Sequence, residues 1–417
     1  MQSADVAILG AGIAGVSTAL HLQARGRDVA LVDRHGAAGL ETSFGNAGVI
    51  ERASLSPYLF PRDVRKLALY ALNLLPEAHY HFSALPEVLP WLWRYYRESA
   101  PDRARKSAEA TRPLIERCVV EHEALMESAH AADLLRKTGW IKVYRKEKSF
   151  AEGVADVERL RRFGLNIDIL DEAGLAAREP SLYGVCGAAH YLDAASIEDP
   201  SRLTQAYADL FIARGGRFLT GDARSVQEAA DGRWTLETEA GELAAAELVV
   251  ALGPWSDLVT RELGYAFPMA VKRGYHMHYA PRDGGTLSRP VLDADAGYVL
   301  APMTRGLRLT TGAEFAKRDA PPTPTQIDAC EPFARKLFPL GERLDAKPWM
   351  GSRPCFPDML PVIGRAPKHE RLWFNFGHQH HGLTLGPVCG RLLAEVMTGE
   401  TPFADPAPYR AERFDSG

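Results

Sequence analysis

The feature that most constrains the fold is a glycine pattern near the amino terminus, between two apolar runs. Val6–Leu9 precede GAGIAG, a helix-forming stretch follows, and a second apolar run, DVALVDR, ends near Asp33. In a strand–turn–helix unit, Gly10 permits a tight turn, Gly12 lets a pyrophosphate approach the backbone, and Gly15 lets the helix pack on the sheet. Asp33 then stands where a carboxylate can accept hydrogen bonds from a ribose diol. The order of strand, glycines, helix, strand and acid predicts a βαβ dinucleotide-binding unit.

Composition excludes several classes of protein. The chain has 417 residues, of which 46% are apolar and 24% charged, and this is typical of a globular protein with one large domain or two. A net charge of −4 argues against a nucleic-acid partner, which requires a basic surplus. The cysteines form no CxxC pair, so neither a disulfide framework nor a cysteine metal site is expected. They are Cys118, Cys186, Cys330, Cys355 and Cys389.

These features predict a cytoplasmic protein. The nucleotide-binding strand begins within a few residues of Met1, which leaves no room for a signal peptide, and no apolar run is long enough to cross a bilayer. Residues 54–97 are rich in aromatic residues and proline, and they include LALYALNLLP and LPWLWRYY. Such short amphipathic segments cover a domain face or lie on a membrane. Peripheral contact with the inner face of the membrane therefore stays open.

Two more stretches are predicted to approach the cofactor. The segment RHGAAGLETSFGNAGVI is too poor in bulky residues to be a core element, so its backbone can press against a flat ligand. Thr42 and Ser43 can donate hydroxyls to phosphate, and Ala47–Val49 can pass close to a ring. The strand of VVALGPWS ends at Gly253, where a second close approach is expected.

The whole pattern predicts an α/β protein with two domains. Residues 1–53, 196–262 and 348–417 are assigned to a discontinuous, Rossmann-like nucleotide domain, in which Pro200 opens a helix. Residues 54–195 and 263–347 are assigned to a substrate domain. Because residues 265–315 alternate as strands, this domain is expected to contain a mainly antiparallel sheet.

Six blocks resemble the D-amino-acid oxidase superfamily of flavoproteins, which includes glycine oxidase, sarcosine oxidase and the bacterial D-amino-acid dehydrogenases. They are GAGIAG with Asp33, ETSFGNAG, VVALGPWS, TTGAEF, GSRPCFPDMLPVIG and GHQHHGLTLGP. ETSFGNAG is most similar to the D-amino-acid dehydrogenase branch. The resemblance implies FAD in an extended pose and covers most of the chain.

The resemblance also implies cofactor contacts. Ile13 and Ala14 would meet the pyrophosphate, with Asp33 and Arg34 at the adenosine end. Val226 matches a position whose main chain reads the adenine edge. The remaining contacts would be Thr42 and Ser43 near phosphate, Ala47, Gly48 and Val49 against the flavin, and a loop under the isoalloxazine that contains His378, Gln379, His381, Gly382, Leu383 and Thr384. The helix that this loop opens would stabilise negative charge on the reduced flavin.

Three residues are expected to act on the substrate. Arg353, bracketed by Gly351 and Pro354, suits a bidentate carboxylate clamp and matches the family's carboxylate-binding arginine. Tyr298 matches a tyrosine whose hydroxyl shares that carboxylate. His380 stands where glycine oxidase has a second arginine, which leaves it as a hydrogen-bonding partner, a proton acceptor or a packing residue.

Covalent flavin and metal are not expected. Sarcosine oxidases tether the flavin through a cysteine five residues before the aspartate of this block, and counting back from Asp358 gives Arg353. Cys355 is off that position, so non-covalent FAD is expected. His276, His278 and His381 are not completed into a metal site by any carboxylate pattern.

The predicted activity is FAD-dependent oxidative deamination of a D-amino acid, with hydride transfer from Cα to flavin N5. A cyclic substrate such as D-proline or hydroxy-D-proline is included, and a quinone or another acceptor would receive the electrons. Two alternatives stay open on the same fold. They are a glycine- or sarcosine-type amine oxidase that uses dioxygen, and a 2-hydroxy-acid dehydrogenase.

Overall fold

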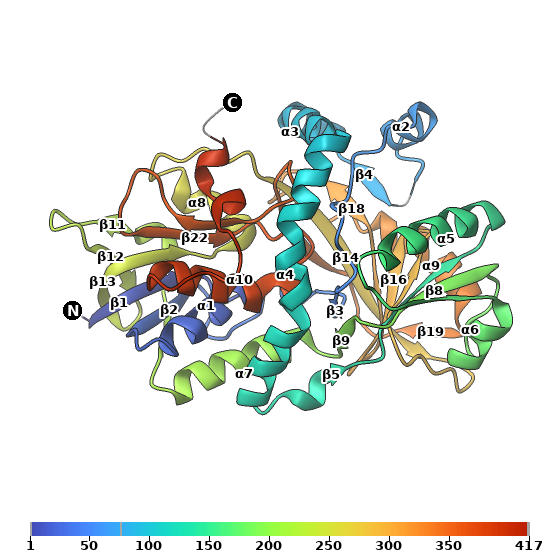
Figure 1. Cartoon of the computed structure of the whole chain (residues 1–417), viewed down its shortest axis with the longest axis horizontal. Coiled ribbons are helices and arrows are strands. Elements are labelled where there is room, and N and C mark those ends of the chain that lie inside the picture. The colour runs from blue at the N-terminus through green and yellow to red at the C-terminus, as the bar shows by residue number, and fades with distance from the viewer. Residues whose placement is uncertain (1, 76, 415–417) are drawn as a thin grey trace.

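The computed structural model describes residues 2–75 and 77–414 and contains two large sheets side by side (Figure 1). The first sheet has the strand order β10–β2–β1–β13–β12–β11, with β22 and β21 attached beside β13. Its strands are β1 (Gln2–Leu9), β2 (Val29–Asp33), β10 (Arg217–Thr220), β11 (Gln227–Glu228), β12 (Trp234–Thr238), β13 (Gly241–Val250), β21 (Val362–Arg365) and β22 (Leu372–Phe376). β1 pairs in parallel with β2 and β13, as the βαβ prediction requires.

Helices cover this first sheet. They are α1 (Ile13–Gln23), α4 (Pro101–Ser128), α7 (Pro200–Ala213), α8 (Asp257–Thr260) and α10 (Gly382–Met397). α7 begins at Pro200 as predicted, and Asp199 caps it by accepting from the Arg202 N–H at 3.0 Å. α1 and α10 pack so closely that a Cβ at Gly390 would lie only 2.8 Å from the Thr18 nitrogen. Glycine at this position allows that approach. The chain therefore fixes the amino-terminal turn and the carboxyl-terminal helix against each other.

The second sheet is larger and mainly antiparallel, which confirms the predicted fold class. Its path is β4–β18–β14–β17–β16–β15–β6–β8–β7, with β19 and β20 also paired to β14. The bounds are β4 (Ala78–Tyr80), β6 (Trp140–Tyr144), β7 (Ile167–Leu170), β8 (Gly187–Tyr191), β14 (Ala270–Pro281), β15 (Val291–Asp293), β16 (Tyr298–Met303), β17 (Gly306–Thr310), β18 (Ala313–Phe315), β19 (Leu340–Arg343) and β20 (Trp349–Cys355).

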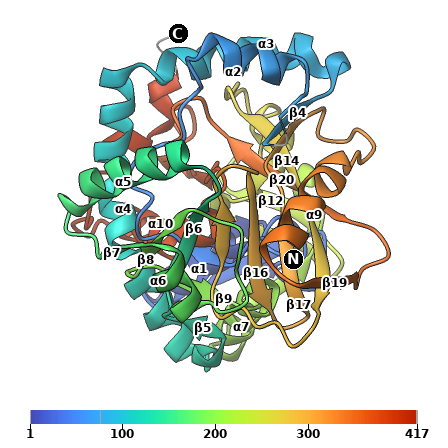
Figure 2. The ribbon, with the colours of Figure 1, turned by 90° about the vertical axis from the view of Figure 1, so that its right-hand side faces the viewer.

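Further helices lie around the second sheet (Figure 2), and the chain also contains a small three-stranded sheet. The helices are α2 (Val64–Ala71), α3 (Leu85–Glu98), α5 (Glu147–Arg161), α6 (Glu172–Arg178) and α9 (Thr325–Leu337). The small sheet contains β3 (Val49–Ile50), β5 (Leu135–Arg136) and β9 (Ala195–Ile197). No helix within the described ranges is long and apolar enough to cross a membrane.

Two elements bear on the sequence-based domain boundaries. β20 was assigned to the nucleotide domain, but it pairs with β14 along seven positions of the second sheet. α4 was assigned to the substrate domain, and its buried Leu114, Ile115 and Cys118 share an apolar core that extends from α1 and α10 to β6 and α5. Both elements depend on long-range packing that local sequence patterns do not encode.

Candidate active site

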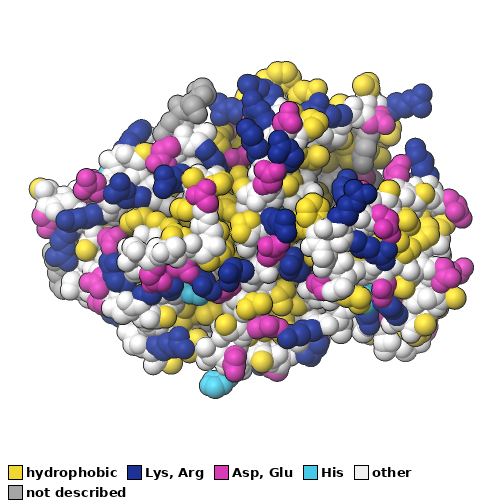
Figure 3. Space-filling view, in the orientation of Figure 1, with side chains coloured by type: hydrophobic (Ala, Val, Ile, Leu, Met, Phe, Trp, Pro, Cys, Tyr) yellow, Lys and Arg dark blue, Asp and Glu magenta, His cyan; other side chains and the backbone are white. Residues whose placement is uncertain are grey.

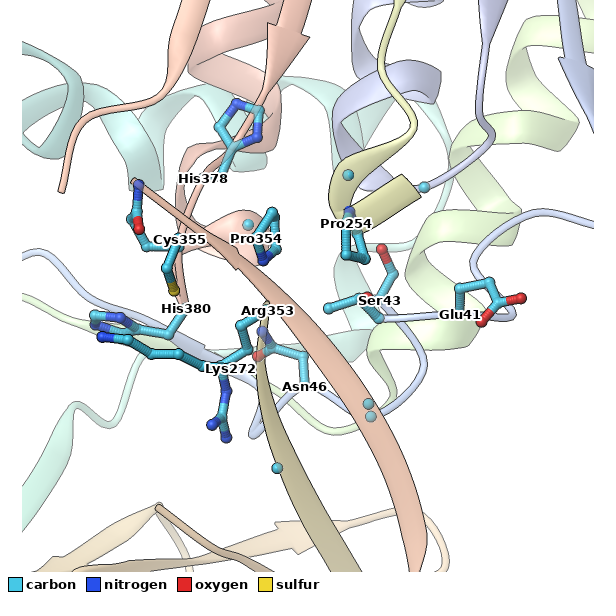
Figure 4. Close-up of a pocket in the computed structure, with 18 of the residues that line it drawn as sticks. Glu41, Ser43, Asn46, Pro254, Lys272, Arg353, Pro354, Cys355, His378 and His380 are labelled. Carbon is cyan, nitrogen blue, oxygen red and sulfur yellow. The ribbon is translucent and has the colours of Figure 1, made fainter. Parts of the chain in front are cut away.

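One large cavity of about 1350 Å³ lies between the two sheets and receives residues from both. Figure 4 shows Ser43 and Glu41 toward one side of the view, and Lys272, Arg353 and His380 toward the other. The residues that line the cavity extend from Asp33, at the end of β2, to the loop that precedes α10. Most of the predicted cofactor residues and all three predicted substrate residues line it.

The amino-terminal glycines are placed as a phosphate-binding turn requires. Gly10 has a φ of +102°, which favours glycine, and a Cβ at Gly15 would lie 1.9 Å from the Gly10 carbonyl oxygen. α1 therefore starts flush against the end of β1. Ser43 reaches this helix start and accepts from the Ile13 N–H at 3.1 Å. The helix N-terminus and the Ser43 hydroxyl thus form an anion site from two separate segments.

Asp33 and Arg34 mark the other end of this nucleotide region. Asp33 Oδ2 accepts from the Ala11 N–H at 2.7 Å and Oδ1 accepts from the His35 N–H at 2.9 Å. These bonds fix the carboxylate at the cavity wall while leaving each oxygen able to accept from a ribose hydroxyl. The Arg34 guanidinium lies 4.4 Å from the Trp255 ring centroid and pairs with Glu41.

The loop after β2 folds over the cavity. The Thr42 hydroxyl donates to the Ser352 carbonyl at 2.7 Å, so it is already engaged within the protein. Ala47 and Val49 line the cavity, whereas Gly48 turns its backbone toward the Ile197 carbonyl, 2.3 Å from where a Cβ would be. Gly48 therefore shapes the loop and does not line the cavity.

At the predicted adenine side, the turn before Val226 lines the cavity. Gly253 lines the cavity with a φ of +55°. Val226 does not line it and packs against the apolar core of the first sheet. The preceding turn supplies Asp222, Ala223 and Arg224 to the wall instead. The structure thus brings the neighbourhood of Val226 to the cavity but not Val226 itself.

The carboxyl-terminal loop forms the opposite wall. His378, Gln379, His381, Gly382, Leu383 and Thr384 all line the cavity. α10 begins at Gly382 without a side-chain cap, so its first N–H groups are available to a ligand. The Thr384 hydroxyl oxygen accepts from the Glu51 N–H at 3.1 Å, which joins this helix start to the segment after β3. The charge of the helix dipole at this end favours an anionic group.

His378 is fixed by a buried polar chain. Its Nε2 lies 3.1 Å from Asn375 Oδ1, and Asn375 Nδ2 donates to the Thr18 hydroxyl at 2.8 Å. Thr18 in turn donates to the Ala14 carbonyl at 2.7 Å. Burial lowers the pKa of His378 to about 4, so the imidazole is neutral at physiological pH. The chain connects the flavin-side loop with the first turn of α1.

Arg353 lies on β20 and is held by backbone carbonyls. Its Nη1 donates to the Gly312 oxygen at 2.7 Å and its Nη2 donates to the Thr311 oxygen at 3.1 Å. The guanidinium packs flat on Gly274, where a Cβ would lie 2.4 Å from Nη2. Within the described chain it forms no ion pair with a carboxylate. A cation oriented in this way, with donors to spare, is suited to bind an acid group.

Lys272 is a second cation that the sequence-based prediction missed. The β14–β20 register places Lys272 directly opposite Arg353, so the two side chains share one face of the sheet. The Lys272 ammonium lies 4.6 Å from the ring centroid of Tyr95 and 4.9 Å from that of Trp91. Burial lowers its pKa, and Arg353 lowers it further. Among the described residues, no carboxylate pairs with it.

A signal for Lys272 was present in the sequence but incomplete. In AVKRGYHMHYA, strand alternation places Lys272 and Gly274 on one face and Arg273 on the other. The strand partner was not deducible. Arg273 turns into the sheet core and pairs with Glu314 at 2.6 Å, so the adjacent basic residues have opposite roles.

His380 lies beside both cations. Its buried Nε2 has no hydrogen-bond partner in the part of the chain that the structure describes. Burial lowers the pKa of His380 well below its ordinary value, and the nearby His381, Arg353 and Lys272 lower it further. The imidazole is therefore neutral, and its unpartnered Nε2 is suited to form a hydrogen bond with a ligand.

Tyr58 and Tyr298 both lie at the cavity, and of these two Tyr58 is the one that contacts His380. Tyr298 lines the cavity, but its hydroxyl lies 3.4 Å from Arg145 Nη2, beside the Arg145–Asp293 ion pair. The Tyr58 ring packs edge-on against His380, with ring centroids 4.5 Å apart. The Glu51 carboxylate raises the pKa of the Tyr58 hydroxyl, and Arg353 opposes that shift. Tyr58 lies in the proline-rich stretch, where no motif singled it out.

Two histidine clusters lie outside this group. His79, His81 and Glu314 come within 4.8 Å of one another, but Glu314 is already neutralised by Arg273 and hydrogen-bonded by Tyr275 at 2.7 Å. This cluster is an ion-pair network that fastens β4 to β18. His276 and His278 lie on β14 among Trp349 and Arg308, away from the cavity lining.

Together, the glycine turn, the two helix starts at the cavity and the cations without a carboxylate partner in the described ranges fit an enzyme that binds an extended dinucleotide cofactor beside an acid group. The groups present fit FAD: the Asp33 carboxylate as acceptor at a ribose position, Ser43 and the start of α1 at phosphate, and the start of α10 at the ring. The chain belongs to the FAD dependent oxidoreductase family, whose sequence model matches residues 5–396.

Known proteins similar to this chain agree with that family. It is 30% identical to a D-amino-acid oxidase of Bradyrhizobium diazoefficiens, with 99% of each chain covered. It is also 30% identical to a D-amino acid dehydrogenase of Granulibacter bethesdensis, with 98% of this chain and 99% of the relative covered. The solved structure of glycine oxidase from Geobacillus kaustophilus matches with a TM-score of 0.72 at 21% identity, covering 99% of both chains. The predicted superfamily, fold class and FAD cofactor are confirmed.

Proposed function

We propose that this FAD-dependent oxidoreductase deaminates a D-amino acid, cyclic D-amino acids such as D-proline included, and passes the electrons to a quinone or another acceptor. The observation that carries the proposal is the pair of cations Arg353 and Lys272, which have no carboxylate partner among the described residues and line the cavity beside His380. The names of the relatives support the D configuration and the amino-acid substrate.

Each residue of the group has a distinct task in this proposal. Arg353 binds the substrate carboxylate with its remaining N–H donors, and Lys272 adds a second positive charge beside it. The Tyr58 ring packs against His380, and its hydroxyl would donate to that carboxylate. Bound FAD would supply the acceptor for the hydride that leaves Cα.

The same cations favour a reactive amine. A substrate ammonium beside Arg353 and Lys272 loses its proton more readily than in water, because like charges disfavour the charged form. The open Nε2 of His380 is placed to accept a hydrogen bond from the amine, but the same two cations also lower the pKa of His380, so the imidazole is a weak base. The imino product would then hydrolyse in water to a 2-oxo acid.

The test is anaerobic bleaching of the flavin by a panel of D-, L- and N-alkyl amino acids together with 2-hydroxy acids. We expect the D-amino acids to bleach the flavin fastest. Bleaching only by 2-hydroxy acids would make the chain a hydroxy-acid dehydrogenase. Rapid reoxidation of the bleached protein by dioxygen would instead favour an amine oxidase of the glycine or sarcosine type.

The surface of α2 and α3 supports a membrane-borne acceptor. Val64, Leu72, Phe82 and Trp93 are 78%, 65%, 65% and 61% exposed. Figure 3 shows hydrophobic and basic side chains together over α3 at the top of the view. Exposed basic residues among those described in this stretch include Arg62, Arg65, Arg94 and Arg97. Apolar side chains among arginines fit an anionic lipid surface, and this surface is formed by segments that also wall the cavity.

Vesicle sedimentation tests this contact. Phosphatidylglycerol vesicles should sediment the protein, and phosphatidylcholine vesicles should sediment less of it. Trp93→Ser together with Phe82→Ser should lower binding to the anionic vesicles about tenfold or more, because both side chains lose their apolar burial. Phe333→Ser, at an exposed site on α9, is the matched control. Equal binding by the double variant and the wild type would contradict the proposed membrane face.

A further inference from the structure

Three successive residues of the loop over the cavity are seated in the second sheet. The Phe44 ring centroid lies 6.1 Å from that of His276 and 5.8 Å from that of Trp349. Gly45 rests on the same indole, since a Cβ there would lie 1.7 Å from Trp349. Gly45, Asn46 and Ala47 line the cavity on their other side. The loop is therefore a layer between the substrate-domain sheet and the cofactor region.

Arg308 on β17 binds this loop from below. Its Nη1 donates to the Asn46 carbonyl at 2.5 Å and to the Phe44 carbonyl at 3.1 Å. One guanidinium thus contacts the carbonyl groups of both residues that flank Gly45. Arg308 is 5% exposed, so these are bonds in the protein interior.

A buried polar chain orients Arg308. Its Nε donates to His278 Nε2 at 3.1 Å, which fixes the His278 tautomer with its hydrogen on Nδ1. That Nδ1 lies 2.7 Å from Asp345 Oδ2 and donates to it. The Asp345 carboxylate therefore acts on Arg308 through a neutral imidazole.

The charge of Arg308 has no direct counterion. Its guanidinium forms no ion pair with a carboxylate among the described residues, and Asp345 and Asp199 act on it only over a longer range. Burial lowers the pKa of Arg308 to about 10, so it stays protonated at neutral pH. Burying a cation without a counterion is costly, and here the carbonyl dipoles of Phe44 and Asn46 offset the cost. The loop and the arginine depend on each other.

We propose that Arg308, oriented by His278 and Asp345, is a positioning residue for FAD: it holds the Phe44–Asn46 backbone in the shape against which the flavin rests. The inference rests on the proposed place of the flavin beside Ala47, and it adds a role for the substrate domain in cofactor binding. The arginine acts through the loop and is not assigned a contact with the substrate.

The test compares Arg308→Met, Arg308→Lys and the matched control Arg343→Met in FAD titrations of apoprotein, followed by flavin fluorescence. Arg343 lies on β19 of the same sheet and pairs with Glu331 and Asp328 near the surface. Arg308→Met leaves two carbonyls unpaired, so its FAD Kd should rise about 10- to 100-fold. The FAD Kd of Arg308→Lys should lie between those of the wild type and Arg308→Met, because one ammonium cannot reproduce the planar fork of the guanidinium. The Kd of Arg343→Met should equal that of the wild type.

The flavin midpoint potential provides a second readout. Removing the positive charge in Arg308→Met should lower it, since a nearby cation stabilises the negative charge of the reduced ring. Neither measurement uses a substrate, so failure of D-amino-acid bleaching would leave both readouts intact. An Arg308→Met protein with wild-type FAD affinity and potential would overturn the inference.

If Arg308→Met does not fold, two substitutions that change the packing of the loop provide a second test. Gly45→Ala adds a methyl group against Trp349 and should weaken FAD binding by displacing the loop. Trp349→Leu in the same chain makes room for that methyl and should restore part of the affinity. If Gly45→Ala binds FAD normally, or if the double variant shows no recovery of FAD affinity, the loop is not positioned by its contact with Trp349.

Discussion

At the scale of single residues, the cavity is defined by charges without partners. Arg353 and Lys272 are adjacent across β14 and β20, and no described carboxylate pairs with either. Arg353→Ala should therefore lower kcat/KM for the preferred amino acid by roughly a hundredfold or more, since removing one member of a buried charge pair typically costs about 2–5 kcal/mol. Arg353→Lys should also be impaired, because it lacks the planar fork. Steady-state kinetics across a substrate panel would check this, and near-wild-type kcat/KM would remove Arg353 from the substrate site.

Lys272 has a separate signature in pH dependence. Burial and the charges of His381, Arg353 and Lys272 hold the pKa of His380 well below its ordinary value. Removing one of these positive charges in Lys272→Met raises the pKa of His380 toward that value. The acid limb of kcat/KM should move to higher pH in the variant, because His380 becomes protonated sooner as the pH falls. Lys272→Arg, which keeps the charge, should retain the wild-type limb. Identical profiles for all three proteins would contradict this coupling.

At the scale of elements, α10 lacks one backbone hydrogen bond, and a side chain from α4 replaces it. Pro387 lies inside the helix and has no N–H to donate to the Leu383 carbonyl one turn earlier. His122, which is fully buried on α4, donates from Nε2 to that carbonyl at 2.7 Å, and its Nδ1 lies 3.1 Å from the Tyr207 hydroxyl. Thus α4 completes the helix whose first turn forms a cavity wall.

His122→Leu should destabilise the protein by about 1–3 kcal/mol, because it leaves the buried Leu383 carbonyl unpaired. His122→Gln keeps a neutral donor and should be milder. Urea unfolding of the holoprotein, with release of flavin fluorescence as a second signal, would measure both. Equal stability of the leucine and glutamine variants would show that the bond to Leu383 contributes nothing.

The elements also show which features the sequence predicts. Local order in the chain was enough for β1, α1 and β2, and for the start of α7 at Pro200, because each depends on neighbouring residues. The partners of β14 were not predictable, since the register that brings Lys272 to Arg353 joins positions 81 residues apart. The same reason explains the position of Val226 and the engagement of Tyr298 by Arg145. Long-range pairing decides where these side chains lie.

At the scale of the whole molecule, buried neutral histidines connect the cavity with the stability of the fold. Burial lowers the pKa of His122 and of His378 to about 4, and that of His21 to about 3. Each lies in or beside the α1–α10 packing that holds the two cavity walls together. Acid should therefore loosen the cofactor site and the fold in the same pH range.

Below pH ~6.5 these histidines take up protons in the unfolded chain while they stay neutral in the native protein. A lowered native pKa gives stability that is fully present above the unfolded pKa and is lost as the pH falls toward the native one. The free energy of unfolding should therefore decline between about pH 6.5 and 4, by about 1.4 kcal/mol per pH unit for each such histidine. Thermal unfolding at pH 7.5, 6.0 and 5.0 would measure the slope. His122→Gln removes one titrating group while keeping its hydrogen bond, so its Tm should fall less steeply with acid than that of the wild type. A Tm unchanged between pH 7.5 and 5.0 would show that these histidines are not protected from protons in the folded state.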